Sequence, residues 1–197
     1  MTGRRAAAPR HAAPVSSRPR EVRLIGGQWK RSKLPVADHP GLRPTPDRVR
    51  ETLFNWLGQD LSGWRVLDAF AGSGALGFEA ASRGAASVVL LERDPGLVRS
   101  LQGIKTRLTA EMVQVLPADA LAWMGRQAPA AYELILLDPP FDAGLAQPAL
   151  NAALPLLVSG GWIYLEAAQP LEALPPGLRE HRRLRAGAVS AQLLQVD

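Results

Sequence analysis

Four consecutive residues, Asp138, Pro139, Pro140 and Phe141, are best suited to chemistry and directly follow the apolar run YELILL. A nucleobase amino group is a poor nucleophile because its lone pair is delocalised into the ring. The Asp138 carboxylate and the Pro139 carbonyl can accept its two hydrogens, while the prolines stiffen the chain and remove competing donors. Phe141 can stack on the base, a contact of about 1–3 kcal/mol. This DPPF tetrad predicts a catalytic site for an exocyclic amino nitrogen, although a plain turn after a strand would also explain Pro-Pro.

A glycine-rich segment, DAFAGSGALG at residues 68–77, follows an earlier apolar run and begins a helical pattern. Its glycines also satisfy the GxGxxG pattern of dinucleotide sites. A helix N-terminus that faces a pyrophosphate would be disfavoured by an adjacent acid, whereas S-adenosylmethionine carries a sulfonium and an ammonium and no phosphate. Asp68 in front of the glycines therefore favours S-adenosylmethionine over a nicotinamide dinucleotide.

Two later acids that end apolar runs complete the expected cofactor site. Glu92 can accept both ribose hydroxyls, and Asp119 can accept from the adenine amino group or, alternatively, cap a helix. The N–H of Ala120 lies beside Asp119. The cofactor-binding residues predicted from the sequence are Asp68, Phe70, Ala71, Gly72, Ser73, Gly74, Glu92, Asp119 and Ala120.

Five apolar runs must position these residues, and they alternate with segments of helical character. Strands that are apolar on both faces and joined by helices indicate a parallel sheet covered on both sides. Two further strand candidates flank Gly187 and fit an antiparallel pair at the sheet edge. The predicted fold class is α/β, a Rossmann-like, doubly wound, mostly parallel sheet of seven strands. Ligands bind such a sheet at the carboxyl ends of its strands.

The segment before the first core strand predicts a hairpin and a helix. Residues 21–36 contain short β-forming runs around Gly26-Gly27, which suit a turn with positive φ. In the helix that follows, we expect Thr45 as N-cap, Pro46 at the first helical position and Gly58 at the end.

Charge is distributed unevenly along the 197 residues, which carry a net charge of +5. Residues 1–33 contain nine Lys and Arg against Glu21, a net of +8, which leaves −3 for residues 34–197. We therefore expect a polyanionic partner that contacts hairpin cations. These cations are Arg23, Lys30, Arg31 and Lys33. The chain is predicted to comprise a disordered basic tail (1–20), an RNA-facing extension (21–58) and an S-adenosylmethionine-dependent domain (59–197). For residues 1–20 alone, a solvated tail that only keeps the protein soluble explains the charge equally well.

Composition excludes several kinds of site. The chain has no Cys for disulfides or thiolate metal ligands, and its three His are scattered, so we expect no metal. No apolar run approaches the roughly 20 residues that span a bilayer, and no signal segment opens the chain. The sequence has no sustained heptad repeat, and we expect a monomer. The absence of Cys suits a reducing cytoplasm, where we expect the protein to act.

The chain resembles the bacterial RsmD-type methyltransferases over about residues 23–187. The resemblance rests on RLIGGQWKRSKL, RPTPDRVRETLFNWL, DAFAGSGALGFEAASRGA, LLERD and LILLDPPF. It implies a class I methyltransferase fold and methyl transfer from S-adenosylmethionine, leaving S-adenosylhomocysteine, to the N2 amine of one guanine in 16S ribosomal RNA. It also implies that Arg43, Pro44 and Thr45 lie near the cofactor crevice and the RNA entrance. Ribosomal proteins of the assembling or assembled small subunit are then neighbours. The tail and the C-terminal AQLLQVD depart from the family pattern.

Three other interpretations remain open from the residues alone. An adenine-N6 methyltransferase acting on DNA or RNA could use the same tetrad, because cations that bind phosphates do not choose the base. A non-catalytic RNA-binding assembly factor would use the fold as a platform, and the intact tetrad disfavours it. A nicotinamide oxidoreductase would leave both Asp68 and the tetrad unexplained.

Overall fold

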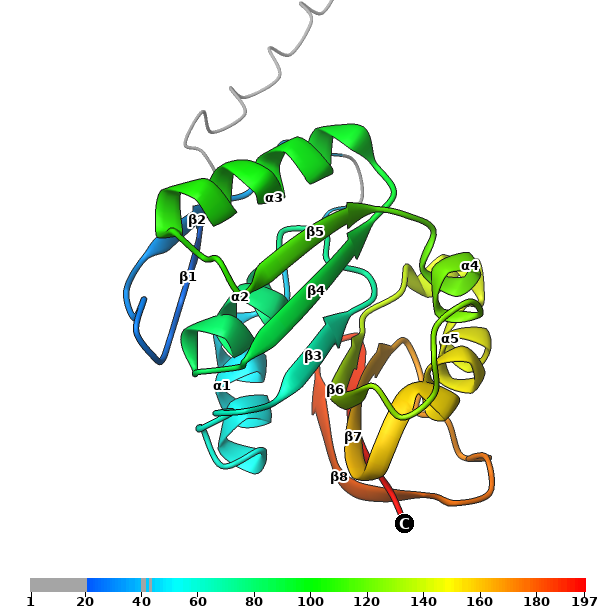
Figure 1. Cartoon of the computed structure of the whole chain (residues 1–197). Helices are drawn as coiled ribbons and strands as arrows, with labels where there is room; N and C mark the ends of the chain where they lie inside the picture. Colours follow the sequence, from blue (N-terminus) through cyan, green and yellow to red (C-terminus); the bar gives the residue numbers. More distant parts are fainter. Residues whose placement is uncertain (1–20, 40–41, 43) are drawn as a thin grey trace, which may run out of the picture.

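A seven-stranded sheet forms the centre of the molecule in the computed structural model, which describes residues 21–39, 42 and 44–197 (Figure 1). The strands lie in the order β5-β4-β3-β6-β7-β9-β8. The parallel strands are β3 (Arg65–Asp68), β4 (Ser87–Glu92), β5 (Val113–Pro117), β6 (Tyr132–Leu137) and β7 (Leu157–Ala167). Two antiparallel strands complete one edge, β8 (Leu178–Ala186) and β9 (Val189–Val196). The predicted α/β class, the seven mostly parallel strands and the terminal antiparallel pair are confirmed.

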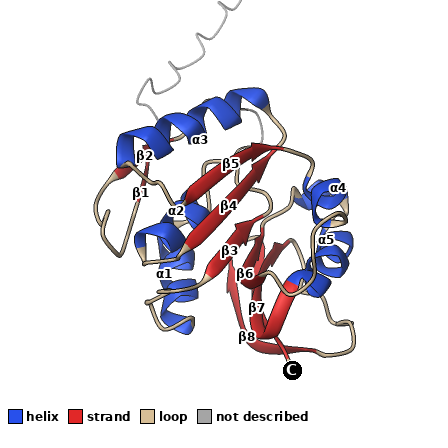
Figure 2. Cartoon of the chain, in the orientation of Figure 1, coloured by secondary structure: helices blue, strands red, loops and turns tan. Residues whose placement is uncertain are grey.

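Helices cover both faces of the sheet (Figure 2). One face carries α1 (Asp47–Trp56), α2 (Ala75–Ser82) and α3 (Pro95–Leu108), and the other carries α4 (Ala120–Met124) and α5 (Ala146–Ala153). Short 3-10 turns lie at Phe141–Ala143 and Leu154–Leu156. In β6, Leu134 and Leu136 enter the first core, while Ile135 and Leu137 enter the second. The strand sequences are therefore apolar throughout, because both faces are buried.

The sheet has a topological switch point between β3 and β6. β3 pairs in parallel with both β4 and β6, and the chain builds the sheet outward from this centre in opposite directions. Loops that leave the carboxyl ends of two such strands diverge and open a crevice. The glycine loop follows β3 and the DPPF tetrad follows β6, so the two predicted motifs flank this crevice.

A hairpin, β1 (Glu21–Arg23) paired with β2 (Lys33–Pro35), begins the N-terminal extension, as predicted. At its turn Gly27 has a φ of +72°, and a side chain there would collide with the backbone carbonyl of Ser82. The N–H of Trp29 donates to the Ser82 hydroxyl at 3.0 Å. A glycine is required because the turn lies directly on the C-terminal end of α2.

A buried ionic cluster around Glu79 of α2 fastens the hairpin to the sheet. The Glu79 carboxylate accepts from the N–H groups of Ile25 and Gly26, both at 2.8 Å. It also pairs with the guanidinium groups of Arg50 at 3.3 Å and Arg83 at 2.9 Å. Glu79 and Arg50 are fully buried. Since α2 begins at the glycine loop and ends beneath the hairpin, the same helix holds both the N-terminal extension and the glycine loop.

Helix α1 begins one residue later than predicted, and the predicted Thr45 cap is wrong. Pro46 occupies the N-cap position with φ −57° and ψ 147°, and no side chain caps the helix. Thr45 is instead buried and lines the neighbouring cavity. The end of the helix agrees with the sequence, because the helix stops at Trp56 and Gly58 adopts a φ of +85°.

Candidate active site

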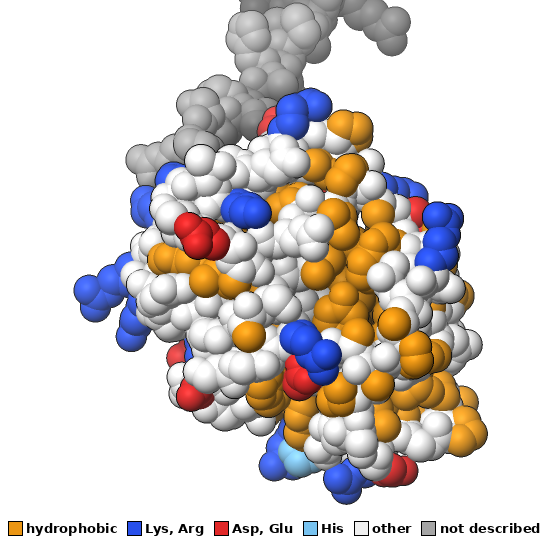
Figure 3. All heavy atoms as spheres, in the orientation of Figure 1, with side chains coloured by type: hydrophobic (Ala, Val, Ile, Leu, Met, Phe, Trp, Pro, Cys, Tyr) orange, Lys and Arg blue, Asp and Glu red, His pale blue; other side chains and the backbone are white. Residues whose placement is uncertain are grey.

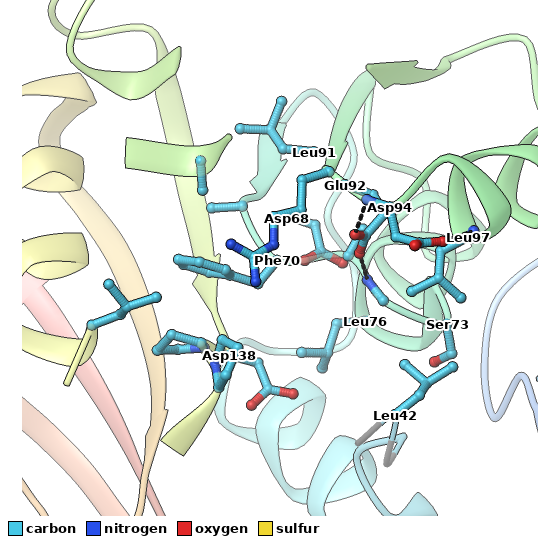
Figure 4. A pocket seen from close by; sticks show the side chains of 18 of the residues that line it. Leu42, Asp68, Phe70, Ser73, Leu76, Leu91, Glu92, Asp94, Leu97 and Asp138 are labelled. Carbon is cyan, nitrogen blue, oxygen red and sulfur yellow. Dashed lines mark hydrogen bonds between the residues drawn. The ribbon is translucent and has the colours of Figure 1, made fainter. Parts of the chain in front are cut away.

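A cavity of about 920 Å³ opens at the carboxyl ends of β3, β4, β5 and β6 (Figure 4). This volume lies within the range of ~300–1,000 Å³ typical of small-molecule sites. The predicted cofactor and catalytic residues that line it are Asp68, Phe70, Ala71, Gly72, Ser73, Glu92, Asp119, Ala120, Asp138, Pro139, Pro140 and Phe141. Residues from four separate strand ends therefore meet where the sequence placed them.

Gly74 is the predicted cofactor residue that lies outside this lining. It is the N-cap of α2 with a φ of +77°, and its N–H donates to the carbonyl of Ala71 at 2.6 Å. A Cβ at this position would lie 2.6 Å from Phe78 and 2.7 Å from Leu101. Gly74 thus turns the loop sharply into the helix, while the residues before it face the cavity.

Asp68 presents a buried oxygen that lacks a partner. Its Oδ2 accepts from the N–H of Gly77 at 2.9 Å. Among the described residues, nothing hydrogen-bonds to the buried Oδ1. Burial raises the pKa of the Asp68 carboxyl to about 7, although the backbone N–H groups of Gly77 and Phe70 act to lower it. Because an unpartnered buried acceptor is costly, the site fits a ligand that brings a cationic donor to Oδ1.

Glu92 holds the rim of the cavity in place. Its Oε2 accepts from the N–H of Gly72 at 3.0 Å and its Oε1 from the N–H of Asp94 at 2.8 Å. Asp94 in turn caps α3 by accepting from the N–H groups of Gly96 and Leu97. Each oxygen of Glu92 keeps a further acceptor site, so the carboxylate is fixed in position and can still accept hydroxyl donors.

Asp119 caps a helix and also lies in the cavity lining, so the adenine-binding role stays a prediction. Its Oδ1 accepts from the N–H of Ala122 at 2.9 Å, which makes it the N-cap of α4, and it also lines the cavity. Ala120, the first residue of α4, lies beside it in the lining. The cap fixes the carboxyl while Oδ2 stays available to a ligand.

The DPPF tetrad borders the other side of the cavity. Figure 4 shows the Asp138 carboxyl directed into the cavity, across from Asp68. Burial, followed by the charges of Glu166 and Asp68, raises the pKa of Asp138 well above its usual value. Phe141 is 40% exposed at the rim, where an aromatic face can stack on an incoming base. Pro139 and Pro140 lack N–H groups, so the carbonyls of this turn face no competing backbone donors from them.

Sequence analysis missed one neighbour of Asp138, Glu166, whereas it placed Thr45 near the cofactor crevice, where Thr45 lies. Glu166, in β7, is 2% exposed and accepts the Tyr164 hydroxyl at 2.8 Å. Thr45 is buried beside Asp138 in the lining of the cavity, and its side chain opposes the rise in the pKa of both Asp138 and Glu166. The signal that could have revealed Glu166 is an acid near the carboxyl end of the apolar run GWIYLEA, the same pattern that singled out Asp68 and Glu92.

The predicted RNA-binding cations lie on the exposed surface of the hairpin. Arg23, Lys30, Arg31 and Lys33 are all exposed, and Lys33 pairs with Glu21 at 2.8 Å. Figure 3 shows Lys and Arg side chains projecting from the left edge of the molecule, where the hairpin lies in Figure 1. Arg43 and the tail at residues 1–20 lie outside the described residues. Thr45 lines the cavity, and RNA binding by these residues stays a prediction.

Two further findings concern the same residues, 21–39, 42 and 44–197. No group of three or more His, Asp or Glu side chains there is arranged to hold a metal ion. None of the helices there combines the length and the apolar character needed to cross a bilayer.

A seven-stranded, mostly parallel sheet with an acid-bordered cavity at its switch point, facing the DPPF turn, is the arrangement of class I methyltransferases. Comparisons with known proteins agree. The family described as "Conserved hypothetical protein 95" matches residues 22–195. A solved structure described as the putative methyltransferase yhhF from Escherichia coli superposes with a TM-score of 0.82 and 38% identity, covering 90% of this chain and 98% of that one.

The chain belongs to the ribosomal RNA small subunit methyltransferase D family, and the resemblance expected from the sequence is confirmed. It is 41% identical over 183 residues to the protein of that name from Escherichia coli (strain K12), covering 89% of this chain and 90% of that protein. The Haemophilus influenzae protein of the same name is 39% identical over 165 residues, 79% of this chain and 83% of that protein. The chain is therefore an enzyme of the methyltransferase class, and the oxidoreductase interpretation is set aside.

Proposed function

We propose that this enzyme transfers a methyl group from S-adenosylmethionine to the N2 amine of a guanine in 16S ribosomal RNA. One observation carries the proposal: the unpartnered Asp68 Oδ1 and the DPPF tetrad border the same cavity. One side of the cavity suits a cationic cofactor and the other suits an amino group. The relatives named ribosomal RNA small subunit methyltransferase D support ribosomal RNA as the acceptor.

The cavity residues fit the cofactor. When bound, S-adenosylmethionine supplies an electrophilic methyl group on a sulfonium, and S-adenosylhomocysteine is the product. Asp68 would hold the ammonium, Glu92 the ribose hydroxyls, and Asp119 with the N–H of Ala120 the adenine. The backbone at Gly72 would lie along the methionine portion, since no side chain obstructs it there.

The DPPF tetrad would hold the base. Asp138 and the Pro139 carbonyl accept the two amine hydrogens, which frees the nitrogen lone pair, and Phe141 stacks on the ring. An ionised carboxylate accepts an amine hydrogen more strongly than a protonated carboxyl does, so binding of the amine favours loss of the Asp138 proton. A cationic ligand in the cavity favours that ionised form.

Cofactor affinity is expected to depend on pH through Asp68. The pKa of about 7 in the free protein means that a growing fraction of Asp68 is protonated as pH falls below 7. The protonated acid cannot pair with an ammonium, so the dissociation constant for S-adenosylmethionine should rise by up to about tenfold per pH unit below 7 and level off above it. Calorimetric titrations from pH 5.5 to 8.5 measure this. The Asp68→Asn variant should bind weakly with a flatter profile, and a profile identical to wild type would contradict the assignment.

Hairpin cations are expected to set the salt dependence of RNA binding. Replacing Lys30, Arg31 and Lys33 with glutamine together should weaken binding to 16S RNA and reduce the slope of log K against log salt by roughly 0.7–0.9 per lost phosphate contact. Filter binding at several salt concentrations measures the slope.

The matched control for the hairpin variant removes three arginines from β8, at the edge of the sheet away from the hairpin. These are Arg179, Arg182 and Arg185, all exposed. Their replacement with glutamine changes the net charge equally and should leave most of the slope intact. Equal effects of the two triple variants would mean that net charge rather than the hairpin governs binding.

The class of acceptor is tested by offering several polymers with labelled S-adenosylmethionine. Small subunits, naked 16S RNA and double-stranded DNA are incubated in parallel, and ribonuclease or deoxyribonuclease then shows which polymer carries the label. We expect label in RNA alone. Label in DNA would favour the adenine-N6 interpretation.

The cellular setting belongs to the same proposal. We expect the enzyme to act as a monomer in the cytoplasm on the assembling or assembled small subunit, with ribosomal proteins nearby. Comparing methylation rates of subunits and naked RNA tests the setting, because faster methylation of naked RNA would argue against it.

A further inference from the structure

Guanine carries one donor for which the proposed function provides no acceptor. Asp138 and the Pro139 carbonyl take the two hydrogens of the N2 amine, and the ring N1–H lies next to that amine on the same edge of the base. A buried donor without a partner weakens binding. A site that holds guanine by its amine should therefore offer a further acceptor beside the DPPF tetrad.

Glu166 is an acid that the sheet places next to Asp138. Strands β6 and β7 run in parallel beside each other (Figure 2), and Leu137 pairs with Leu165. The next residues along the two strands are Asp138 and Glu166. Neighbouring strands lie about 4.8 Å apart, and side chains at paired positions point to the same face. The two carboxyl groups are therefore neighbours, which agrees with the pKa of Asp138, raised by burial and then by the Glu166 charge.

A second, smaller cavity borders Glu166 beside the tetrad. Its volume is about 40 Å³, and its lining residues are Pro139, Pro140, Phe141, Gly144, Leu145, Ala146, Glu166, Ala167 and Ala168. Among these described residues, Glu166 has the only polar side chain. The space is too small for a whole base, but it has room for about two or three waters, which the edge of a base can displace.

Phe141 connects this second cavity with the main one. It lines both, as do Pro139, Pro140 and Leu145, and its side chain is 40% exposed. A base stacked on the Phe141 ring can direct its N2 amine into the main cavity toward Asp138. The neighbouring N1 position of the same base then points toward Glu166.

Tyr164 fixes the Glu166 carboxyl and still leaves it an acceptor. The fully buried Tyr164 donates its hydroxyl to Oε1 of Glu166 at 2.8 Å. Oε2 is then the oxygen for a ligand to approach. A carboxyl group offers an acceptor oxygen whether or not it is protonated, so the contact does not require one charge state.

We infer that Glu166 determines the choice of base by accepting the N1–H of guanine. The inference rests on the proposed function. In adenine, the ring nitrogen N1 beside the amine carries a lone pair instead of a hydrogen, and this lone pair would face the Glu166 oxygen. Hydrogen bonds of this kind discriminate between bases by roughly 10–10²-fold. Glu166 thus makes the choice that phosphate-binding cations cannot make.

Two bases with the same amine test the contact. 2-Aminopurine has the C2 amine of guanine, but its N1 is an acceptor. The monophosphates of guanosine and of 2-aminopurine riboside are titrated into the protein saturated with S-adenosylhomocysteine, and 2-aminopurine fluorescence reports direct binding and competition. We expect the wild-type protein to bind guanosine monophosphate roughly 10–10²-fold more tightly.

Glu166→Gln should abolish or reverse this preference. The Tyr164 hydroxyl would hold the amide oxygen, so the amide N–H₂ would take the place of Oε2 and donate to the N1 of 2-aminopurine. The control is Glu172→Gln, the same change at an exposed acid paired with Arg183, which should keep the wild-type preference. An unchanged preference in Glu166→Gln would overturn the inference, because another group would then select the base. Equal shifts in the two variants would also overturn it.

Binding and methyl transfer separate this inference from the proposed function. If Glu166→Gln shifts the preference and the wild-type protein methylates no RNA, the proposed function fails while the base contact stands. If the wild-type protein forms N2-methylguanosine in RNA and Glu166→Gln keeps the full preference for guanosine monophosphate, the base contact fails while the proposed function stands.

Discussion

Replacing Asp138 with alanine is expected to lower kcat by roughly 10²–10³-fold, the range seen when a preorganised partner of the reacting group is removed. The Asp138 carboxylate accepts an amine hydrogen and so frees the nitrogen lone pair. Its charge also stabilises the positive charge that develops on that nitrogen. Neither task concerns the cofactor, so the dissociation constant of S-adenosylmethionine should change only a few-fold. Single-turnover rates and calorimetry on the same variant give the two quantities.

Unfolding is not expected to explain this loss. The pKa of Asp138 is raised in the folded protein, so above its ordinary pKa this group opposes folding, increasingly so as pH rises. Removing it at pH 8 should leave Tm unchanged or higher. Asp138→Asn keeps the shape, loses the charge and should be nearly as slow as the alanine variant. Parallel loss of turnover and cofactor affinity would contradict the amine-binding role.

Replacing Glu79 with glutamine is expected to lower the free energy of unfolding by about 3–5 kcal/mol, the cost of leaving buried charges uncompensated. Arg50 is fully buried and Arg83 is 7% exposed, and both pair with this carboxylate. The N–H groups of Ile25 and Gly26 also lose their charged acceptor. Chemical denaturation measures the loss, and amide exchange at Ile25 and Gly26 should accelerate because the hairpin loosens.

An exposed ion pair provides the control for Glu79. Glu133 pairs with Arg65 at 2.6 Å near the solvent, and Glu133→Gln should cost no more than about 1 kcal/mol. Similar costs for Glu79→Gln and Glu133→Gln would show that the buried cluster does not hold the extension. In the Glu79→Gln variant, Arg50 keeps its ion pair with Asp47, and Arg83 keeps its position over the Phe54 ring. These remaining contacts should keep the variant folded enough for its stability to be measured.

The sheet and the cavity could be predicted because they follow from local patterns. Strands buried on both faces are apolar throughout, and parallel strands place the residues that follow them at one edge of the sheet. Asp68, Glu92, Asp119 and Asp138 each come directly at a strand end or just after it. To predict that these four acids converge, only the order of the strands in the sheet was needed.

The contacts that the sequence did not predict depend on side chains from distant segments. Thr45 precedes a helix as caps do, yet it is buried in the lining of the cavity beside Asp138. In the sequence, Glu79 resembles a solvent-exposed helix residue. In the structure it is fully buried and pairs with Arg50 and Arg83. In both cases the tertiary contacts of the side chain outweigh the preference that its local sequence position indicates.

The central claim, methylation of a guanine amine held by the DPPF tetrad, is tested most directly by the identity of the product nucleoside. Labelled methyl groups are transferred from S-adenosylmethionine to small ribosomal subunits that lack the modification, and the RNA is digested to nucleosides. We predict that the label appears in N2-methylguanosine. Label in N6-methyladenosine would contradict the choice of base, and no label in subunits or in naked RNA would contradict the claim of catalysis itself.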